Sequence, residues 1–271
     1  MSETALESLL KRDRVVVVTS IVAVTALAWV YVWRLAAGMD MGGMDMTGYR
    51  MISTGFDMVM APAANRWSAT EFALMFAMWA VMMIGMMTPS AAPMILIYAR
   101  AGRMSAGAGA PMAATSLFAA GYLIVWVGFA LAAVTAQWVL ERFALLDPMM
   151  ATAGAVLGGT VLIAAGVYQW TPLKYACLAE CQSPLQFILR QGGFRADAAG
   201  ALRLGATHGL YCVGCCWALM VLLFVGGVMN LLWIAGLSLL ALVEKVAPAG
   251  RAISRAAGAG LIAAGLRLVL A

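Results

Sequence analysis

Long apolar stretches dominate the chain, and short polar or charged segments separate them. Runs of about 20 apolar residues, the length that a helix needs to cross a bilayer, occur seven times in the sequence. These runs are 15–37, 71–100, 113–140, 149–170, 204–224, 229–243 and 256–271. The pattern predicts an all-α fold, a polytopic transmembrane bundle of seven helices, or of six if the short last run lies on the membrane surface.

Charged residues at the ends of these runs predict how the bundle is oriented. Lys11, Arg12 and Arg14 precede the first run, and no cleavage site of small residues follows it. We therefore expect an uncleaved first span and a cytoplasmic N-terminus. The later cytoplasmic turns are marked by charged residues, namely Arg100, Arg103, Glu244, Lys245, Arg251 and Arg255.

Composition agrees with a membrane protein. Hydrophobic residues make up 64% of the chain and charged residues 11%, whereas soluble domains are roughly half apolar and a quarter charged. We expect one transmembrane domain over 1–271, with a cytoplasmic tail at 1–14, an outer loop at 38–67 and a cytoplasmic connection at 171–203. The net charge of +5 gathers near span ends, so lipid rather than nucleic acid is the expected surrounding.

Methionine is unusually abundant, with 21 residues. The outer loop contains the segment MDMGGMDM, which resembles the methionine-rich segments of bacterial copper-handling proteins. Thioether sulfur is a soft ligand that suits Cu(I), so we predict metal capture there by Met41, Met44 and Met46. The alternative is a flexible glycine-rich loop whose methionines are incidental.

The second apolar run carries a methionine stripe. Its members recur at helical spacing and are Met75, Met78, Met82 and Met86. Pro89 and Pro93 follow, and we expect them to kink or break the helix. A broken helix beside soft ligands is typical of a transport path. The alternative is that these methionines only pack between helices.

The segment HGLYCVGCCW opens the fifth run and holds the only histidine of the chain. His208, Cys212, Cys215 and Cys216 fall at i, i+4, i+7 and i+8, so a helix places them on one face. Imidazole and thiolate bind soft or borderline metals. We therefore predict a metal site, against the alternative of cysteines that pack as small apolar residues and a histidine bonded to a carbonyl.

A second cysteine pair lies in the cytoplasmic connection. A helix that begins at Pro172 puts Cys177 and Cys181 one turn apart on the same face. Helical neighbours are too far apart for an undistorted disulfide, so metal chelation is the better interpretation, and Glu180 is a harder ligand between them. All five cysteines and the histidine fall at the same predicted depth of the membrane.

Three stretches carry a resemblance to a known family. WAVMMIGMMTPSAAPMI, LKYACLAECQSPLQFIL and the stretch from LGATHGLYCVGCCW to LLALVEK resemble a family of uncharacterised bacterial integral membrane proteins labelled as predicted metal-binding. The likeness covers about 67–248. It implies a multi-pass bundle in the bacterial inner membrane, with His208, Cys212, Cys215 and Cys216 as its metal site. The family often has histidine between the paired cysteines, where this chain has Glu180.

The sequence leaves several functions open. The first is Cu(I) handling or transport from methionine to cysteine and histidine ligands, with a copper chaperone or membrane protein as partner. The chain has no GxxxxGK loop, so it is not itself an ATP-driven pump. A second is an enzyme, a thiol-disulfide oxidoreductase that uses Cys212 and Cys215. A third is uptake of mercuric or other soft cations, and a structural bundle would leave the sulfur unexplained.

Overall fold

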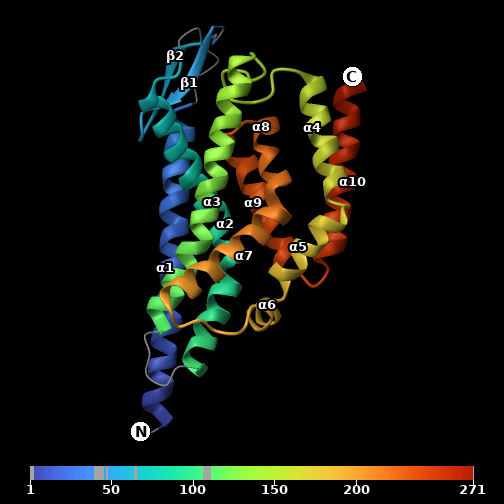
Figure 1. Cartoon of the computed structure of the whole chain (residues 1–271). Coiled ribbons are helices and arrows are strands. Elements are labelled where there is room, and N and C mark those ends of the chain that lie inside the picture. Colours follow the sequence, from blue (N-terminus) through green and yellow to red (C-terminus); the bar gives the residue numbers. More distant parts are fainter. Residues whose placement is uncertain (1–2, 40–45, 47, 64–65, 106–110, 271) are drawn as a thin grey trace.

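The computed structural model is almost entirely helical, which confirms the all-α prediction (Figure 1). It describes the chain except residues 1–2, 40–45, 47, 64–65, 106–110 and 271, and the side chains of 3–13, 105 and 111. The described elements are, in chain order, α1 (Glu3–Ala37), β1 (Tyr49–Ser53), β2 (Met58–Pro62), α2 (Ala69–Ser105), α3 (Pro111–Arg142), α4 (Ala155–Tyr168), α5 (Pro172–Gln182), α6 (Pro184–Arg190), α7 (Ala198–Val221), α8 (Leu223–Gly226), α9 (Leu231–Val246) and α10 (Gly250–Leu270).

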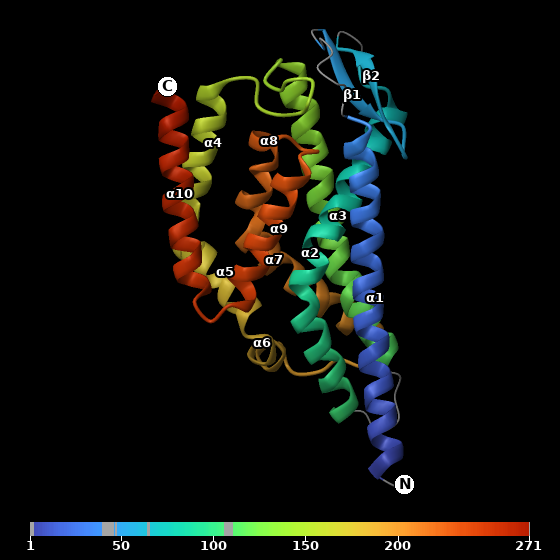
Figure 2. The same cartoon turned by 180° about the vertical axis from the view of Figure 1, so that it is seen from behind.

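The helices form a bundle with α7 and α9 in the middle. On one side of them lie α1, α2 and α3, and on the other side lies the pair of α4 and α10 (Figures 1 and 2). The two strands cap α1, α2 and α3 at one end, and α5 and α6 lie toward the other end, where the chain begins. Because α7 has neighbours on both sides, most of its motif residues are buried.

Fewer helices than predicted are long enough to cross a membrane. Five of the described helices are long and apolar enough, and a sixth span exists only if α4 and α5, which meet at 63°, are taken together. The helix α4 has 14 residues and α9 has 16, shorter than the runs predicted there. The last run is longer than predicted, because α10 begins at Gly250 and has 21 residues.

The predicted outer loop contains a β-hairpin that the sequence did not indicate. Its strands β1 and β2 pair antiparallel, with Met51 opposite Met60. Arg50 donates to Glu71 of α2 at 2.6 Å, and the backbone N–H of Ser53 points at Met75 Sδ at 3.4 Å. These contacts fix the hairpin on the start of α2.

Of the three loop methionines predicted to capture metal, two cannot be placed. Met41 and Met44 lie outside the described residues, whereas Met46 is half-buried. Met46 lines a cavity of about 1100 Å³ beneath the hairpin, together with Arg50 and Trp67. Metal capture by this loop therefore stays a prediction.

Of the kink or break predicted in the second span, the break is wrong, because α2 runs unbroken through Pro89 and Pro93. Hydroxyl groups supply donors to backbone carbonyls around the prolines. Thr88 donates to the carbonyl of Ile84 at 2.6 Å, and Ser90 donates to that of Met87 at 2.9 Å. Neither is one of the carbonyls that a proline leaves without its helical donor, which are those of Gly85 and Pro89, four residues before Pro89 and Pro93.

Two glycines bring α3 and α7 into backbone contact. A Cβ atom at Gly205 would lie 1.9 Å from the carbonyl oxygen of Phe118, and one at Gly121 would lie 2.1 Å from that of Leu202. Small residues permit this close approach between membrane helices. The contact sets Tyr122 of α3 directly against α7, at the level of the cysteine motif.

Candidate metal site

The helix α7 arranges the cysteine motif as its spacing predicts. It begins at an N-cap, Asp197, whose carboxylate accepts a hydrogen bond from the backbone of Gly200 at 2.7 Å. The helix then continues without interruption through the motif, and its period of about 3.6 residues aligns the four predicted ligands. His208, Cys212, Cys215 and Cys216 are all buried.

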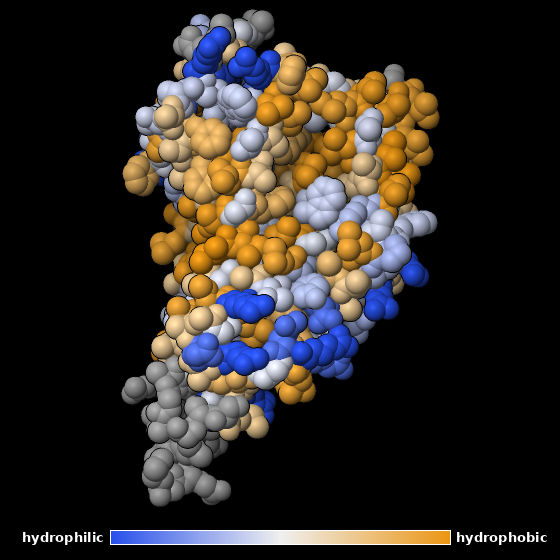
Figure 3. Space-filling view, viewed as in Figure 1, coloured by the Kyte–Doolittle hydropathy of each residue, from blue (hydrophilic) through white to orange (hydrophobic). Residues whose placement is uncertain are grey.

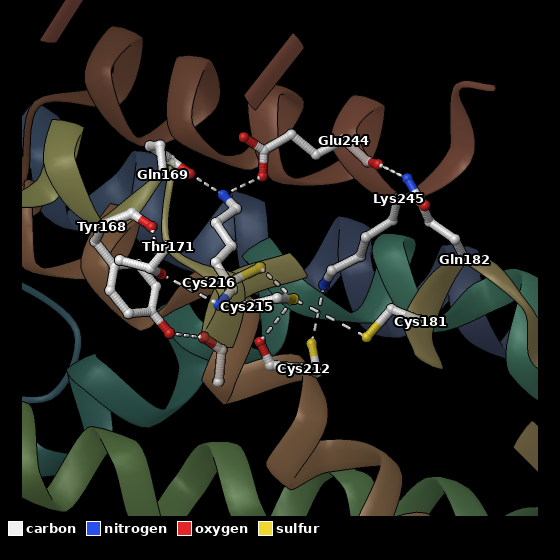
Figure 4. Close-up of polar contacts among 12 residues, drawn as sticks. Tyr168, Gln169, Thr171, Cys181, Gln182, Cys212, Cys215, Cys216, Glu244 and Lys245 are labelled. Atoms are coloured by element: carbon white, nitrogen blue, oxygen red, sulfur yellow. Dashed lines mark hydrogen bonds and ion pairs between the residues drawn. The ribbon is translucent and has the colours of Figure 1, made fainter. Parts of the chain in front are cut away.

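Four sulfur atoms gather where α5 meets α7, and we call Cys181, Cys212, Cys215 and Cys216 the thiol cluster (Figure 4). The Sγ atoms of Cys215 and Cys216 are 3.3 Å apart, and those of Cys181 and Cys215 are 3.9 Å apart. Cys215 also donates to the carbonyl of Cys212 at 3.2 Å. With metal–sulfur bonds of about 2.3 Å, two sulfurs on one ion lie roughly 4 Å apart, so the separation between Cys181 and Cys215 suits a shared ion.

The predicted pair of Cys177 and Cys181 is divided between two environments. Cys181 joins the thiol cluster, whereas Cys177 is half-buried and its Sγ lies against Gly214, 2.6 Å from where a Cβ atom would be. Glu180 accepts from Arg190 at 2.5 Å and so belongs to a surface ion pair. Of these three residues, the structure brings only Cys181 to the other thiols.

His208 lies one turn before Cys212 in an aromatic cage. The rings of Phe118, Tyr122 and Phe187 surround its imidazole, with centroids 5.4–6.1 Å away. Its Nδ1 atom is buried and has no hydrogen-bond partner. A buried polar atom without a partner is costly, so this nitrogen is free to act as a metal ligand, one helical turn from Cys212.

A lysine that the sequence placed in a cytoplasmic turn lies in the site instead. Lys245 is 7% exposed, and its Nζ donates to Cys212 Sγ and to Ser90 Oγ, each at 2.9 Å (Figure 4). The Tyr122 hydroxyl completes the surroundings of Cys212 at 3.1 Å. The structure places Lys245 in the last turn of α9, which packs inside the bundle, and not in the turn that follows it. A charge that ends an apolar run was the available signal.

Glu244 was also predicted in the cytoplasmic turn, and it too is buried. Its carboxylate accepts from Lys174 at 2.7 Å, and Gln169 accepts from the same ammonium group. Gln182 donates to the backbone carbonyl of Glu244 at 2.7 Å. These bonds tie α9 to both ends of α5 and so hold Cys181 in place.

The methionine stripe of α2 is buried throughout and leads to the thiol cluster. Met75, Met78, Met82 and Met86 are each at most 2% exposed. At the end of the stripe, the carbonyl of Met87 accepts from the Tyr122 hydroxyl at 3.0 Å, and that hydroxyl also contacts Cys212. The stripe of buried methionines from Met75 to Met86 thus spans about 16 Å along the helix axis, at 1.5 Å per residue.

Comparison with known proteins identifies the family. The PpoB2 family, which is described as a copper chaperone family, matches residues 76–268. The chain belongs to this copper chaperone family. The match includes most of the methionine stripe, all five cysteines and His208, and it agrees with the metal binding implied by the earlier resemblance. Neither the curated proteins nor the solved structures contain a match.

The donor atoms fit the copper cargo of a PpoB2 copper chaperone. Buried thiols and thioethers are soft ligands, and the unpartnered nitrogen of His208 is a further donor. Within the described part of the chain, no three histidine, cysteine or carboxylate side chains surround a common ion position. The sulfurs instead contact one another, Lys245 and Tyr122, and the pair of Cys181 and Cys215 has the separation that suits one shared ion.

Proposed function

We propose that this protein lies in the cytoplasmic membrane of a bacterium and passes Cu(I) from the methionine stripe to the thiol cluster. The observation that carries the proposal is a row of buried methionines on α2 that is joined to Cys212 through Tyr122. The stripe runs from the hairpin, where Met75 contacts Ser53, to the level of Tyr122, which contacts Cys212. A copper chaperone must retain its ion, and a row of weaker sites that ends in a stronger site retains the ion at that last site.

The ligand chemistry favours one direction of movement. Thioethers bind Cu(I) without losing a proton, whereas cysteine binds as the thiolate and releases a proton. Thiolate is the stronger ligand, so an ion that enters at Met75 gains affinity as it approaches Cys212. Membership of a copper chaperone family favours this function over thiol-disulfide exchange and mercuric-ion uptake.

Surface properties support the membrane location and the orientation. Large apolar side chains cover much of one face of the bundle, and hydrophilic ones gather near the end with α5 and α6 (Figure 3). Exposed leucines occur on several helices, among them Leu27, Leu232 and Leu270. The last part of α2, which includes Arg100, and the helix α6, which ends with Arg190, lie toward the end of the bundle where the chain begins (Figure 1). By the positive-inside rule, this supports our proposal that this end faces the cytoplasm and the hairpin faces outward.

The test is metal content under reducing conditions. We expect the purified protein to hold about one tightly bound copper ion by elemental mass spectrometry, as for a single thiol site. Replacing Cys212, Cys215 and Cys216 together by serine should remove it, while Cys177→Ser, at a half-buried cysteine outside the thiol cluster, should retain it. Stoichiometric copper in the triple variant would overturn the site.

A further inference from the structure

Lys245 is a cation buried beside thiols without a carboxylate partner. Its Nζ contacts Cys212 Sγ and Ser90 Oγ, and within the described residues it takes part in no ion pair. The nearby carboxylate of Glu244 is held by Lys174. Burial of an uncompensated charge is unfavourable, and the group in contact with Lys245 that can balance it is Cys212 as a thiolate.

This fixed positive charge limits which metal ion makes the site neutral. Two thiolates carry a charge of −2, and Lys245 contributes +1. A monovalent ion brings the sum to zero, whereas a divalent ion leaves one positive charge in a low-dielectric interior. This count is for an ion held by two thiolates, that of Cys212, which Lys245 contacts, and one other of the thiol cluster.

We propose that Lys245 is a specificity-determining residue that selects monovalent soft cations over divalent soft cations at the thiol cluster. The proposal rests on the proposed function and deepens it, because it names the residue by which the site distinguishes a monovalent ion from a divalent ion. Softness alone does not make this distinction, since thiolates also bind divalent soft ions. A charge placed next to the sulfur does.

The experiment compares Ag(I) and Cd(II), two soft ions that differ in charge. Their affinities are measured by competition with chelators on the purified protein, which is first reduced and then freed of reductant and kept without oxygen. In Lys245→Met the ratio of Ag(I) to Cd(II) affinity should fall on the order of a hundredfold, because an ion on Cys212 lies within about 5 Å of Nζ. Lys245→Arg keeps the charge and should keep the ratio.

The ratio separates selectivity from a structural role. Loss of thiolate stabilisation or local packing would weaken both ions by the same factor, and an unchanged ratio in Lys245→Met would therefore overturn the proposal. If that variant does not fold, Lys245→Gln retains a donor for Ser90 and gives the same test. Failure of the wild type to bind Ag(I) at all would instead refute the proposed function.

Discussion

Replacing Gly205 by alanine should disturb the candidate site without altering any of its residues. The added Cβ would lie 1.9 Å from the carbonyl oxygen of Phe118, and real Cβ contacts essentially never fall below 3.0 Å. The helices α3 and α7 must therefore separate by more than about 1 Å, a distance that a tightly packed interior does not absorb. Tyr122 moves with α3, so its 3.1 Å contact with Cys212 should be lost.

The magnitude follows from the nature of the obstacle. Overpacking costs about 1–3 kcal/mol, and a backbone carbonyl cannot rotate away, so Gly205→Ala should lie at the upper end. Alanine recovers up to about 1 kcal/mol through its helix propensity. A net loss of about 2 kcal/mol corresponds to a fall in melting temperature of roughly 4–8 °C. Unfolding can be followed with a thiol-reactive fluorophore, because the thiol cluster is buried until the fold opens.

Gly128 is the matched control on the same helix as Phe118. No atom lies within 4 Å of a Cβ built there, so Gly128→Ala should be neutral or stabilise the protein by up to about 1 kcal/mol. The argument fails if the Gly205 and Gly128 variants melt together and bind Ag(I) equally. It also fails if Gly205→Ala melts early but keeps full Ag(I) affinity, since the link from helix spacing to Cys212 would then be absent.

Three further changes test separate parts of the structure. Lys174→Met leaves the buried carboxylate of Glu244 unpaired and should lower the free energy of unfolding by about 3–5 kcal/mol, measured by the same melting assay. Met82→Leu removes one buried thioether at nearly constant volume and should slow Ag(I) entry into proteoliposomes; Met104→Leu, at a residue 79% exposed, should not. His208→Leu removes an unpartnered buried nitrogen and should raise the unfolding free energy by about 1 kcal/mol while weakening Ag(I) binding. Loss of stability with unchanged binding would make His208 structural.

Local periodicity accounts for what the sequence predicted correctly. The stripes of α2 and α7 follow from the helical repeat, which depends only on spacing along one continuous element. The start of α5 was also predictable, because Thr171 caps the helix and Pro172 occupies its first position. The meeting of Cys181 with Cys215 was anticipated only as a shared depth in the membrane. No spacing rule relates two helices that cross.

Tertiary packing decided what the sequence did not reveal. Lys245 and Glu244 end an apolar run, which is where charges usually reach water, and their burial depends on how α9 packs against α2 and α5. The prolines of α2 predicted a kink or a break, and the helix nevertheless continues through both of them. The hairpin joins two short segments of the predicted loop whose pairing follows from contacts with α2.

Two buried lysines have different roles: the charge of Lys174 stabilises the bundle, and the charge of Lys245 acts on the metal ion that binds. Lys174 has its own carboxylate, Glu244, so its positive charge is balanced whether or not a metal ion is bound. Lys245, which follows Glu244 directly in the sequence, faces a thiol instead. Its charge is balanced by a sulfur that is also a ligand, and any ion at Cys212 changes that balance. Loss of Lys174 should therefore change stability above all, and loss of Lys245 should change which ion binds.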